Sequence, residues 1–395
     1  MSRAHFEDGF GADNIERKCA LSKTPSKPFF RAEQVGSLLR PPRLRDARAQ
    51  FAEGVLSKYG LRDIEDECIA EAVAMQEDIG LPIVTDGEFR RTVWWGDFIG
   101  RMPGIRIGGG DEFSAFRGKD GKPTSYFPRI VETVGPIRHG QPIMEHDFDT
   151  LTRCAHVVPK VTIPAPSRIH FHGGRAAIDP DVYPDLDQFW SDVIAFYRAE
   201  ISALEAQGCR YIQIDDPVLS YFLEDRHRER LTARGEDWRK TLATYIRAVN
   251  ESIALRKPDT LVALHICRGN GPSYWAATGD YARIAEEIFP KLEVDLLLLE
   301  YDDERSGDFI PLKLVPMTQR VVLGLISSKS EVLEGRDQLK RRLEAANRVI
   351  PLERCALSPQ CGFASGADNV PFDFQRQTEK LRLVVDLARE IWGTV

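Results

Sequence analysis

The chain has 395 residues, 43% of them hydrophobic and 29% charged, a composition typical of a soluble globular protein. The net charge of −7 argues against a nucleic-acid-binding surface, and the apolar runs are too short to span a bilayer. The seven cysteines are odd in number and scattered along the chain, unlike a disulfide framework. We therefore expect a cytoplasmic protein that binds neither nucleic acid nor membranes and whose thiols are free to bind metal.

Residues 1–28 are polar and lack the apolar centre of a signal peptide, so we predict a loose N-terminal arm there. We predict that residues 29–395 form a single domain in which short apolar strands alternate with amphipathic helices. The predicted strands cover residues 81–85, 159–163, 211–217, 261–266, 294–299, 320–326 and 355–358. The predicted helices cover residues 61–80, 186–206, 238–253, 281–289, 330–349 and 377–392. This alternation predicts an α/β fold with a parallel sheet, and the number of units fits a (β/α)8 TIM barrel.

The stretch 100–158 differs from this pattern. Glycines separate short alternating segments within it, such as residues 129–134. This texture predicts a loop and hairpin insertion rather than a second domain. No Gly-x-Gly-x-x-Gly motif follows a predicted strand, which removes the usual dinucleotide-binding interpretation.

Polar side chains follow nearly every predicted strand. They are Ser37, Asp86, Glu88, Asp215, Asp216, His265, Cys267, Glu300, Ser327, Ser328 and Cys361. In a TIM barrel the carboxyl ends of the strands meet at one face, where active sites lie. The sequence therefore predicts an active site at this face.

The segment that ends in His265 and Cys267 is the centre of this prediction. Residues two apart on a strand point to the same side, so the imidazole and the sulfur can converge. Taken alone, the pair is more typical of a core histidine beside a core cysteine. Glu300 and Cys361, at the ends of two other predicted strands, complete a plausible set of four zinc ligands.

Several short motifs occur in a fixed order along the chain. They are Val35-Gly36-Ser37, Asp86-Gly87-Glu88-Phe89, Ile212-Gln213-Ile214-Asp215-Asp216-Pro217, His265-Ile266-Cys267, Glu300 and Pro359-Gln360-Cys361-Gly362. With these motifs the chain resembles the C-terminal catalytic barrel of the cobalamin-independent methionine synthase family, over about residues 30–395. That family is similar to the uroporphyrinogen decarboxylase superfamily, which shares the barrel.

The resemblance implies a Zn²⁺ ion that activates a thiol and is held by His265, Cys267, Glu300 and Cys361. It also implies that Ser37, Glu88 and Asp215 hold the polar end of homocysteine, with the two carboxylates as candidate catalytic residues. A carboxylate pair can bind an ammonium group, which makes this assignment physically sensible. The implied activity is zinc-dependent methyl transfer to a thiol such as homocysteine, in methionine biosynthesis.

The partners expected from this resemblance are a small-molecule thiol and a methyl or alkyl donor (a folate, methylcobalamin or another compound). A homo-oligomer is possible, and the sequence leaves the oligomeric state open. Trp94, which follows the Asp-Gly-Glu motif, is a candidate for stacking on a flat donor, or it packs the barrel rim. The chain is too short for the second, N-terminal barrel of the full-length folate enzymes. Their histidine beside a serine is also missing from Ser327-Ser328-Lys329. We therefore leave the donor open.

Three other functions fit parts of the pattern. An epoxide:thiol transferase would use the same activated sulfur to open an epoxide, and it would yield a ring-opened thioether without methyl transfer. A metal-independent decarboxylase would keep its activity after Cys267→Ser. A non-catalytic zinc protein would have no use for Glu88 and Asp215 around an open barrel mouth.

Overall fold

The computed structural model describes residues 27–395 except 112, 114–115, 119–121, 123, 125–126, 272–273 and 368–369. The predicted N-terminal arm therefore lies outside the described residues, apart from its last two. One of these, Lys27, pairs with Asp295 through an Nζ–Oδ1 distance of 2.7 Å. In the part of the chain that is described, no helix combines the length and the apolar character needed to cross a membrane.

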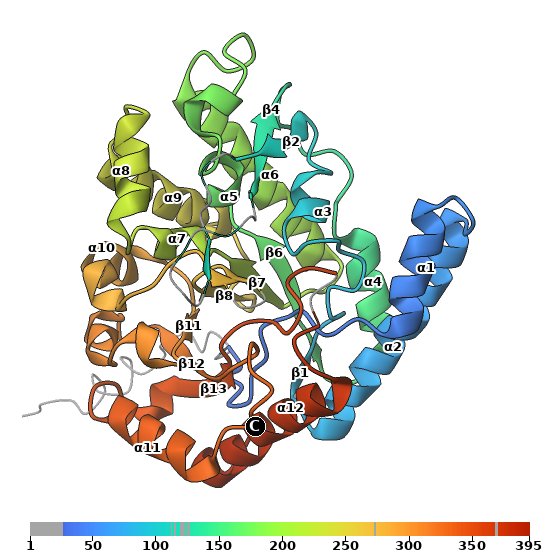
Figure 1. Ribbon diagram of the computed structural model, residues 1–395, viewed down its shortest axis with the longest axis vertical. Helices are drawn as coiled ribbons and strands as arrows, with labels where there is room; N and C mark the ends of the chain where they lie inside the picture. Colours follow the sequence, from blue (N-terminus) through green and yellow to red (C-terminus); the bar gives the residue numbers. More distant parts are fainter. Residues whose placement is uncertain are drawn as a thin grey trace, which may run out of the picture.

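Six parallel strands form the central sheet, in the order β13-β12-β11-β8-β7-β6. Their bounds are β6 (Val161–Pro164), β7 (Tyr211–Asp215), β8 (Leu261–Ile266), β11 (Leu296–Glu300), β12 (Arg320–Ile326) and β13 (Cys355–Pro359). β1 (Ile83–Val84) pairs in parallel with β5 (Val158–Pro159), and β5 directly precedes β6 in the chain. At the opposite edge Ala32 bridges to Leu357 of β13. The strands thus form the predicted (β/α)8 barrel, encircled by helices (Figure 1).

The longer helices cover the outside of the barrel (Figure 1). They are α1 (Pro42–Ala52), α2 (Lys58–Ile79), α4 (Glu145–Cys154), α6 (Leu186–Ala206), α8 (Asp225–Ala233), α9 (Trp238–Ile253), α11 (Arg336–Asn347) and α12 (Phe374–Trp392). The bounds of α2 follow from its sequence, because the Ser57 side chain accepts a hydrogen bond from Gly60 N and Gly80 ends the helix with φ 93°. The shorter helices are α3 (Gly96–Ile99), α5 (Ser167–His170), α7 (Val218–Tyr221), α10 (Ala285–Ile288), η3 (Gly174–Ala177), η4 (Tyr281–Arg283), η5 (Phe289–Lys291), η6 (Glu304–Ser306), η7 (Ile310–Leu314) and η8 (Leu352–Arg354).

Two predicted helices differ from those observed. The continuous helix predicted over residues 281–289 is divided into η4, α10 and η5, because Ile284 has a non-helical φ of −133° and Pro290 follows. The helix predicted to begin at residue 330 begins at Arg336 instead. Neither difference moves a strand of the barrel.

The predicted hairpin insertion is present. β2 (Ile105–Gly110) pairs antiparallel with β4 (Arg129–Thr133). In Figure 1 both strands are drawn above the central strands of the barrel. A second small antiparallel sheet joins β3 (Arg117–Gly118) of the same insertion to β10 (Tyr274–Trp275) and β9 (Asn270–Gly271), which follow β8. Phe116 packs edge-on against Tyr274 with ring centroids 5.3 Å apart. The insertion therefore reaches the loop that leaves the strand of His265 and Cys267.

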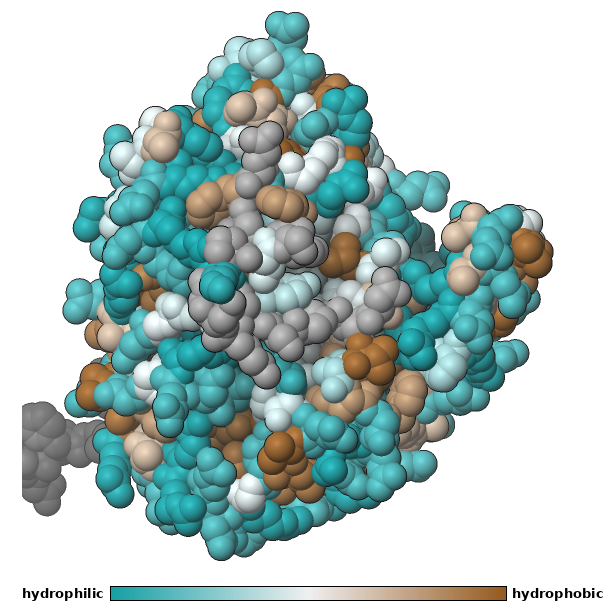
Figure 2. All heavy atoms as spheres, in the orientation of Figure 1, coloured by the Kyte–Doolittle hydropathy of each residue, from teal (hydrophilic) through white to brown (hydrophobic). Residues whose placement is uncertain are grey.

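The inside of the barrel is filled by side chains rather than open. An apolar cluster of Val35, Ile83, Tyr211, Leu261, Ala263, Leu296, Leu298, Val322 and Ala356 occupies it. Hydrophilic residues predominate on the outer face seen in Figure 2, with hydrophobic ones single or in small groups across its described part. The described part of this face offers no broad apolar surface.

Candidate active site

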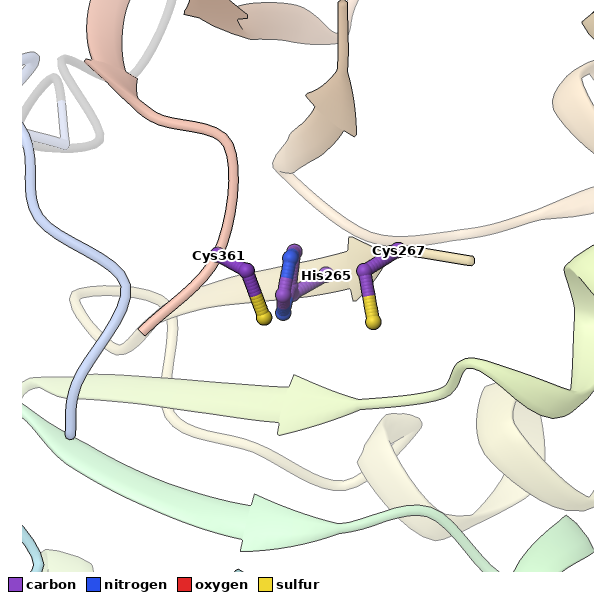
Figure 3. A group of neighbouring side chains, drawn as sticks. All are labelled: His265, Cys267 and Cys361. Atoms are coloured by element: carbon purple, nitrogen blue, oxygen red, sulfur yellow. The ribbon is translucent and has the colours of Figure 1, made fainter. Parts of the chain in front are cut away.

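Three of the four predicted metal ligands meet at the carboxyl end of the barrel. His265 lies in β8, Cys267 follows that strand directly, and Cys361 follows β13. One ligand atom from each lies within 4.8 Å of the other two, and all three residues are buried. Their side chains extend into the same space (Figure 3). Two thiols and an imidazole are a donor set that zinc prefers, so these residues fit the ion that the resemblance implies.

The three side chains of this cluster hold their protons with different strengths. The hydrogen bond between the two thiols lowers the pKa of Cys267 to about 7, opposed by burial and supported by His265. The same hydrogen bond, together with burial, raises the pKa of Cys361 well above its ordinary value. Burial lowers the pKa of His265, but Cys267 and Asp215 raise it to about 9. Cys267 is therefore the thiol that ionises first.

Asp215, at the end of β7, holds the ring of His265. Its Oδ1 lies 3.0 Å from His265 Nδ1, and the two residues are register partners on neighbouring strands. An imidazole whose Nδ1 donates to a carboxylate presents the lone pair of Nε2 to a metal. Asp215 thus has a contact that the sequence did not predict, beside its expected place at the substrate.

Glu300, the fourth predicted ligand, is not a member of this cluster. Its Oε2 accepts a hydrogen bond of 3.0 Å from Arg268 N, and its Oε1 lies 3.1 Å from Lys329 Nζ. Arg305 Nη2 approaches the same Oε1 at 3.5 Å. The carboxylate is completely buried, so its charge is balanced by these two side chains.

A cavity of about 280 Å³ opens onto the His–Cys–Cys cluster. All of the predicted substrate-binding residues line it, namely Ser37, Glu88, Trp94 and Asp215. Aromatic side chains form much of the remaining wall, including Trp95, Phe116, Tyr221 and Tyr274. The cavity therefore has a polar floor at the strand ends and a mainly aromatic mouth.

Glu88 is the most unusual residue of this floor. Among the described residues other than glycine it alone has a positive φ, 58°, a conformation that costs energy and is common at ligand-binding positions. Its Oε1 accepts a hydrogen bond of 2.7 Å from Thr162 Oγ1 and lies 3.4 Å from Arg91 Nη1. Its Oε2 is buried and has no hydrogen-bond partner. A buried, unpartnered carboxylate oxygen at a cavity can accept a hydrogen bond from a cationic ligand.

Ser37, which also lines the cavity, is held by a close backbone approach. Its Oγ lies 3.4 Å from Ala364 N, and a Cβ on Gly362 would lie only 2.0 Å from that Oγ. Only glycine fits at position 362 without moving the serine. The Pro-Gln-Cys-Gly segment therefore both supplies Cys361 and leaves room for Ser37.

The sequence did not identify Arg268 and Lys329 as neighbours of Glu300. Arg268 directly follows Cys267, and Lys329 follows the two serines at the end of β12. Their position next to predicted site residues was the only signal available. Pairing with Glu300 depends on the loops that carry them.

A family model described as the catalytic domain of cobalamin-independent synthase matches residues 151–390. An uncharacterized protein from Bacillus subtilis (strain 168), YxjH, is 39% identical over 368 residues, which are 93% of this chain and 96% of that protein. The chain belongs to the cobalamin-independent synthase family. A relative from Synechococcus named 5-methyltetrahydropteroyltriglutamate–homocysteine methyltransferase is 25% identical over 87% of this chain. The match covers only 41% of that longer relative.

Solved structures of the cobalamin-independent synthase type have the same fold. A Listeria monocytogenes protein, provisionally named a vitamin-B12-independent methionine synthase, matches 93% of this chain with a TM-score of 0.72 and 33% identity, over 99% of its own length. A B12-independent methionine synthase from Shewanella, solved with selenomethionine, matches 93% of this chain and 98% of its own, with a TM-score of 0.71 and 20% identity. These structures confirm the predicted TIM barrel, and the family model and the relatives confirm the resemblance on which the site was predicted.

Proposed function

We propose that this protein is a zinc-dependent S-methyltransferase that methylates an amino-acid thiol, with homocysteine as the substrate that best fits the cavity. The observation that carries the proposal is the position of the unpartnered Glu88 Oε2 in the same cavity as the His–Cys–Cys cluster. A substrate that fills both places has a sulfur at one end and a cation at the other. Membership of the cobalamin-independent synthase family supports a methyltransferase of this type.

In this proposal His265, Cys267 and Cys361 hold the zinc, with Glu300 as a fourth ligand. Zinc, when bound, keeps a substrate thiol in its thiolate form at neutral pH, where a free thiol is mostly protonated. The protein supplies orientation, because the cavity places the sulfur at the strand ends and limits access of water.

The residues of the cavity floor bind the amino-acid part of the substrate. Glu88 Oε2 accepts a hydrogen bond from the ammonium group, and Asp215 adds negative charge nearby while it holds His265. The hydroxyl of Ser37 donates to the substrate carboxylate. Trp94, in the wall of the mouth, stacks on a flat methyl donor.

The methyl donor is left open between a methylated folate, methylcobalamin and another compound. The Synechococcus relative with pteroyltriglutamate in its name is matched over 41% of its length, so its donor does not carry over directly. We propose that residues 29–395 form one catalytic domain, acting in the cytoplasm.

The first test is the metal content of the purified wild type beside Cys361→Ser, with Cys154→Ser as a matched control because Cys154 is half-buried and outside the metal-binding cluster. We expect about one zinc per chain in the wild type and the control, and loss of zinc from Cys361→Ser. Zinc-edge X-ray absorption should gain a sulfur neighbour when homocysteine is added. A metal-free wild type, or a zinc-edge spectrum that does not change when any thiol is added, would refute the proposal.

Product analysis then separates the reactions. With homocysteine and candidate donors, formation of methionine identifies the methyltransferase and its donor. A ring-opened thioether formed from an epoxide, with no methyl transfer from any donor, would instead identify an epoxide:thiol transferase.

A further inference from the structure

The buried carboxylate of Glu300 lies beside cationic side chains that have no role in the proposed reaction so far. Lys329 Nζ lies 3.1 Å and Arg305 Nη2 3.5 Å from Glu300 Oε1, while Arg268 N donates to Oε2 at 3.0 Å. The side chain of Glu300 has no exposed surface, and those of Lys329 and Arg305 are 18% and 19% exposed. We call Lys329 and Arg305 the cation pair.

The cation pair is itself held in place. Lys329 Nζ also lies 3.3 Å from Asp302 Oδ2. The Arg305 guanidinium contacts Asp303 at 2.6 Å and lies over the ring of Trp275, 4.2 Å from its centroid. Both cations therefore stay beside Glu300 without depending on it for every contact.

Glu300 is also close to the metal-binding cluster. It ends β11, which pairs with β8, and Leu299 is the register partner of Ile266. The backbone group that holds its Oε2 belongs to Arg268, the residue after Cys267. Even so, no carboxylate oxygen of Glu300 belongs to the group in which His265, Cys267 and Cys361 converge.

We propose that the cation pair is a holding site for Glu300, so that this carboxylate exchanges between the metal and the cation pair as the substrate sulfur arrives and leaves. This inference rests on the proposed zinc-dependent function, and it makes Lys329 and Arg305 positioning residues. The contacts with Lys329, Arg305 and Arg268 N are those of Glu300 in its held position.

The balance of charge explains why a holding site is needed. Two thiolates neutralise a divalent ion, a carboxylate makes the centre anionic, and an arriving thiolate makes it more so. Releasing Glu300 lowers this repulsion, but a buried carboxylate without a partner is strongly disfavoured. A lysine and an arginine within ion-pair distance remove that obstacle.

The competing explanation is a fixed ion pair that only stabilises the loops, and binding measurements separate the two. We would measure zinc affinity by competition with a chromophoric chelator, and homocysteine affinity of the zinc-loaded protein by calorimetry. The variants are Lys329→Met, which removes the charge at similar length, and Lys329→Arg, which keeps it. Lys291→Met is the control, because Lys291 pairs with Glu287 in another part of the fold.

For Lys329→Met we expect two changes of opposite sign. Zinc should bind about tenfold more tightly without thiol, because Glu300 is no longer drawn to the lysine, and homocysteine should bind about tenfold more weakly, because the displaced carboxylate lacks its partner. Lys329→Arg should restore both values and Lys291→Met should change neither. In a protein that already carries Glu300→Gln, adding Lys329→Met should change neither the zinc affinity nor the homocysteine affinity. If Lys329 acted only through its general electrostatic effect, its removal would still change both affinities in that protein.

Each outcome decides between the explanations. Unchanged affinities, or weakening of both, in a wild type that binds zinc and homocysteine would overturn the holding site and leave the proposed function standing. A wild type that binds no zinc would overturn both.

Discussion

The unpartnered oxygen of Glu88 leads to a sharp prediction for Glu88→Gln. Glutamine keeps an oxygen for Thr162 and Arg91, which contact Glu88 Oε1 at 2.7 and 3.4 Å, so the local structure should survive. The unpartnered oxygen is replaced by an NH₂ group, which cannot accept a hydrogen bond from an ammonium group. The variant should therefore lose affinity for the amino group of the substrate and for nothing else.

The expected loss follows from the charge on both partners. A hydrogen bond to a charged group is worth about 1.5–3 kcal/mol, and about 1.4 kcal/mol corresponds to a factor of ten in affinity. Homocysteine should therefore bind roughly 10- to 150-fold more weakly to Glu88→Gln. Burial raises the pKa of Glu88, so homocysteine binding to the wild type should also weaken as the pH falls through that raised pKa, where the carboxylate becomes protonated.

Calorimetry on the zinc-loaded protein with two ligands tests this reasoning. Homocysteine and 4-mercaptobutyrate share the thiol and the carboxylate, but only homocysteine has an amino group. We expect the loss for homocysteine alone, and no change for Glu132→Gln, whose carboxylate pairs with Arg106 on the β2–β4 hairpin. An equal loss for both ligands would mean that Glu88 shapes the cavity instead of binding the amine. No loss for either would refute its role at the substrate.

Three further changes test other parts of the site. Gly362→Ala should displace Ser37, because the new Cβ would lie 2.0 Å from its Oγ, and should cost about 1–3 kcal/mol in urea unfolding together with weaker homocysteine binding. Burial raises the pKa of Asp216 from 3.8 to about 7, so its contribution to stability is fully present below about pH 4 and is lost as the pH rises through 7. Between pH 5 and 8 the unfolding free energy of Asp216→Asn, which is neutral at every pH, should therefore fall by roughly 2–3 kcal/mol less than that of the wild type. The same pH profile for both proteins would contradict this. Gln213→Met should weaken zinc binding about 10- to 100-fold in a chelator competition, because its amide orients the carboxylate that holds His265.

The barrel and most of the metal cluster could be predicted because their signals are local. β8 is a short run of buried residues, and the alternation along a strand is enough to put His265 and Cys267 on one side. The glycine after α2 and the polar residues after each strand mark where elements end. Cys361 could be placed at the carboxyl end of the barrel once the end of β13 was recognised in the sequence.

The rest depends on contacts between segments far apart in the chain. The pairing of Asp215 with His265 follows from the register of β7 against β8, which no sequence pattern sets. The cation pair comes from loops after β11 and β12 whose conformation depends on Asp302, Asp303 and Trp275. Sequence reasoning therefore found the His and Cys side chains that converge but not the groups that contact them or Glu300.

A chain of polar contacts connects the inside of the barrel to the His–Cys–Cys cluster and orients the ring of His265. Lys160 Nζ lies 3.0 Å from Gln213 Oε1, and Gln213 Nε2 lies 2.8 Å from Asp215 Oδ1. A lysine ammonium can only donate, so the glutamine must turn its oxygen toward it and its NH₂ toward Asp215. The aspartate then accepts on that side, and its Oδ1 lies 3.0 Å from His265 Nδ1, while His265 Nε2 lies 3.3 Å from the carbonyl oxygen of Gln360. A buried lysine, itself paired with Glu33 at 3.0 Å, thus fixes the amide that orients Asp215 and, through it, the ring of His265.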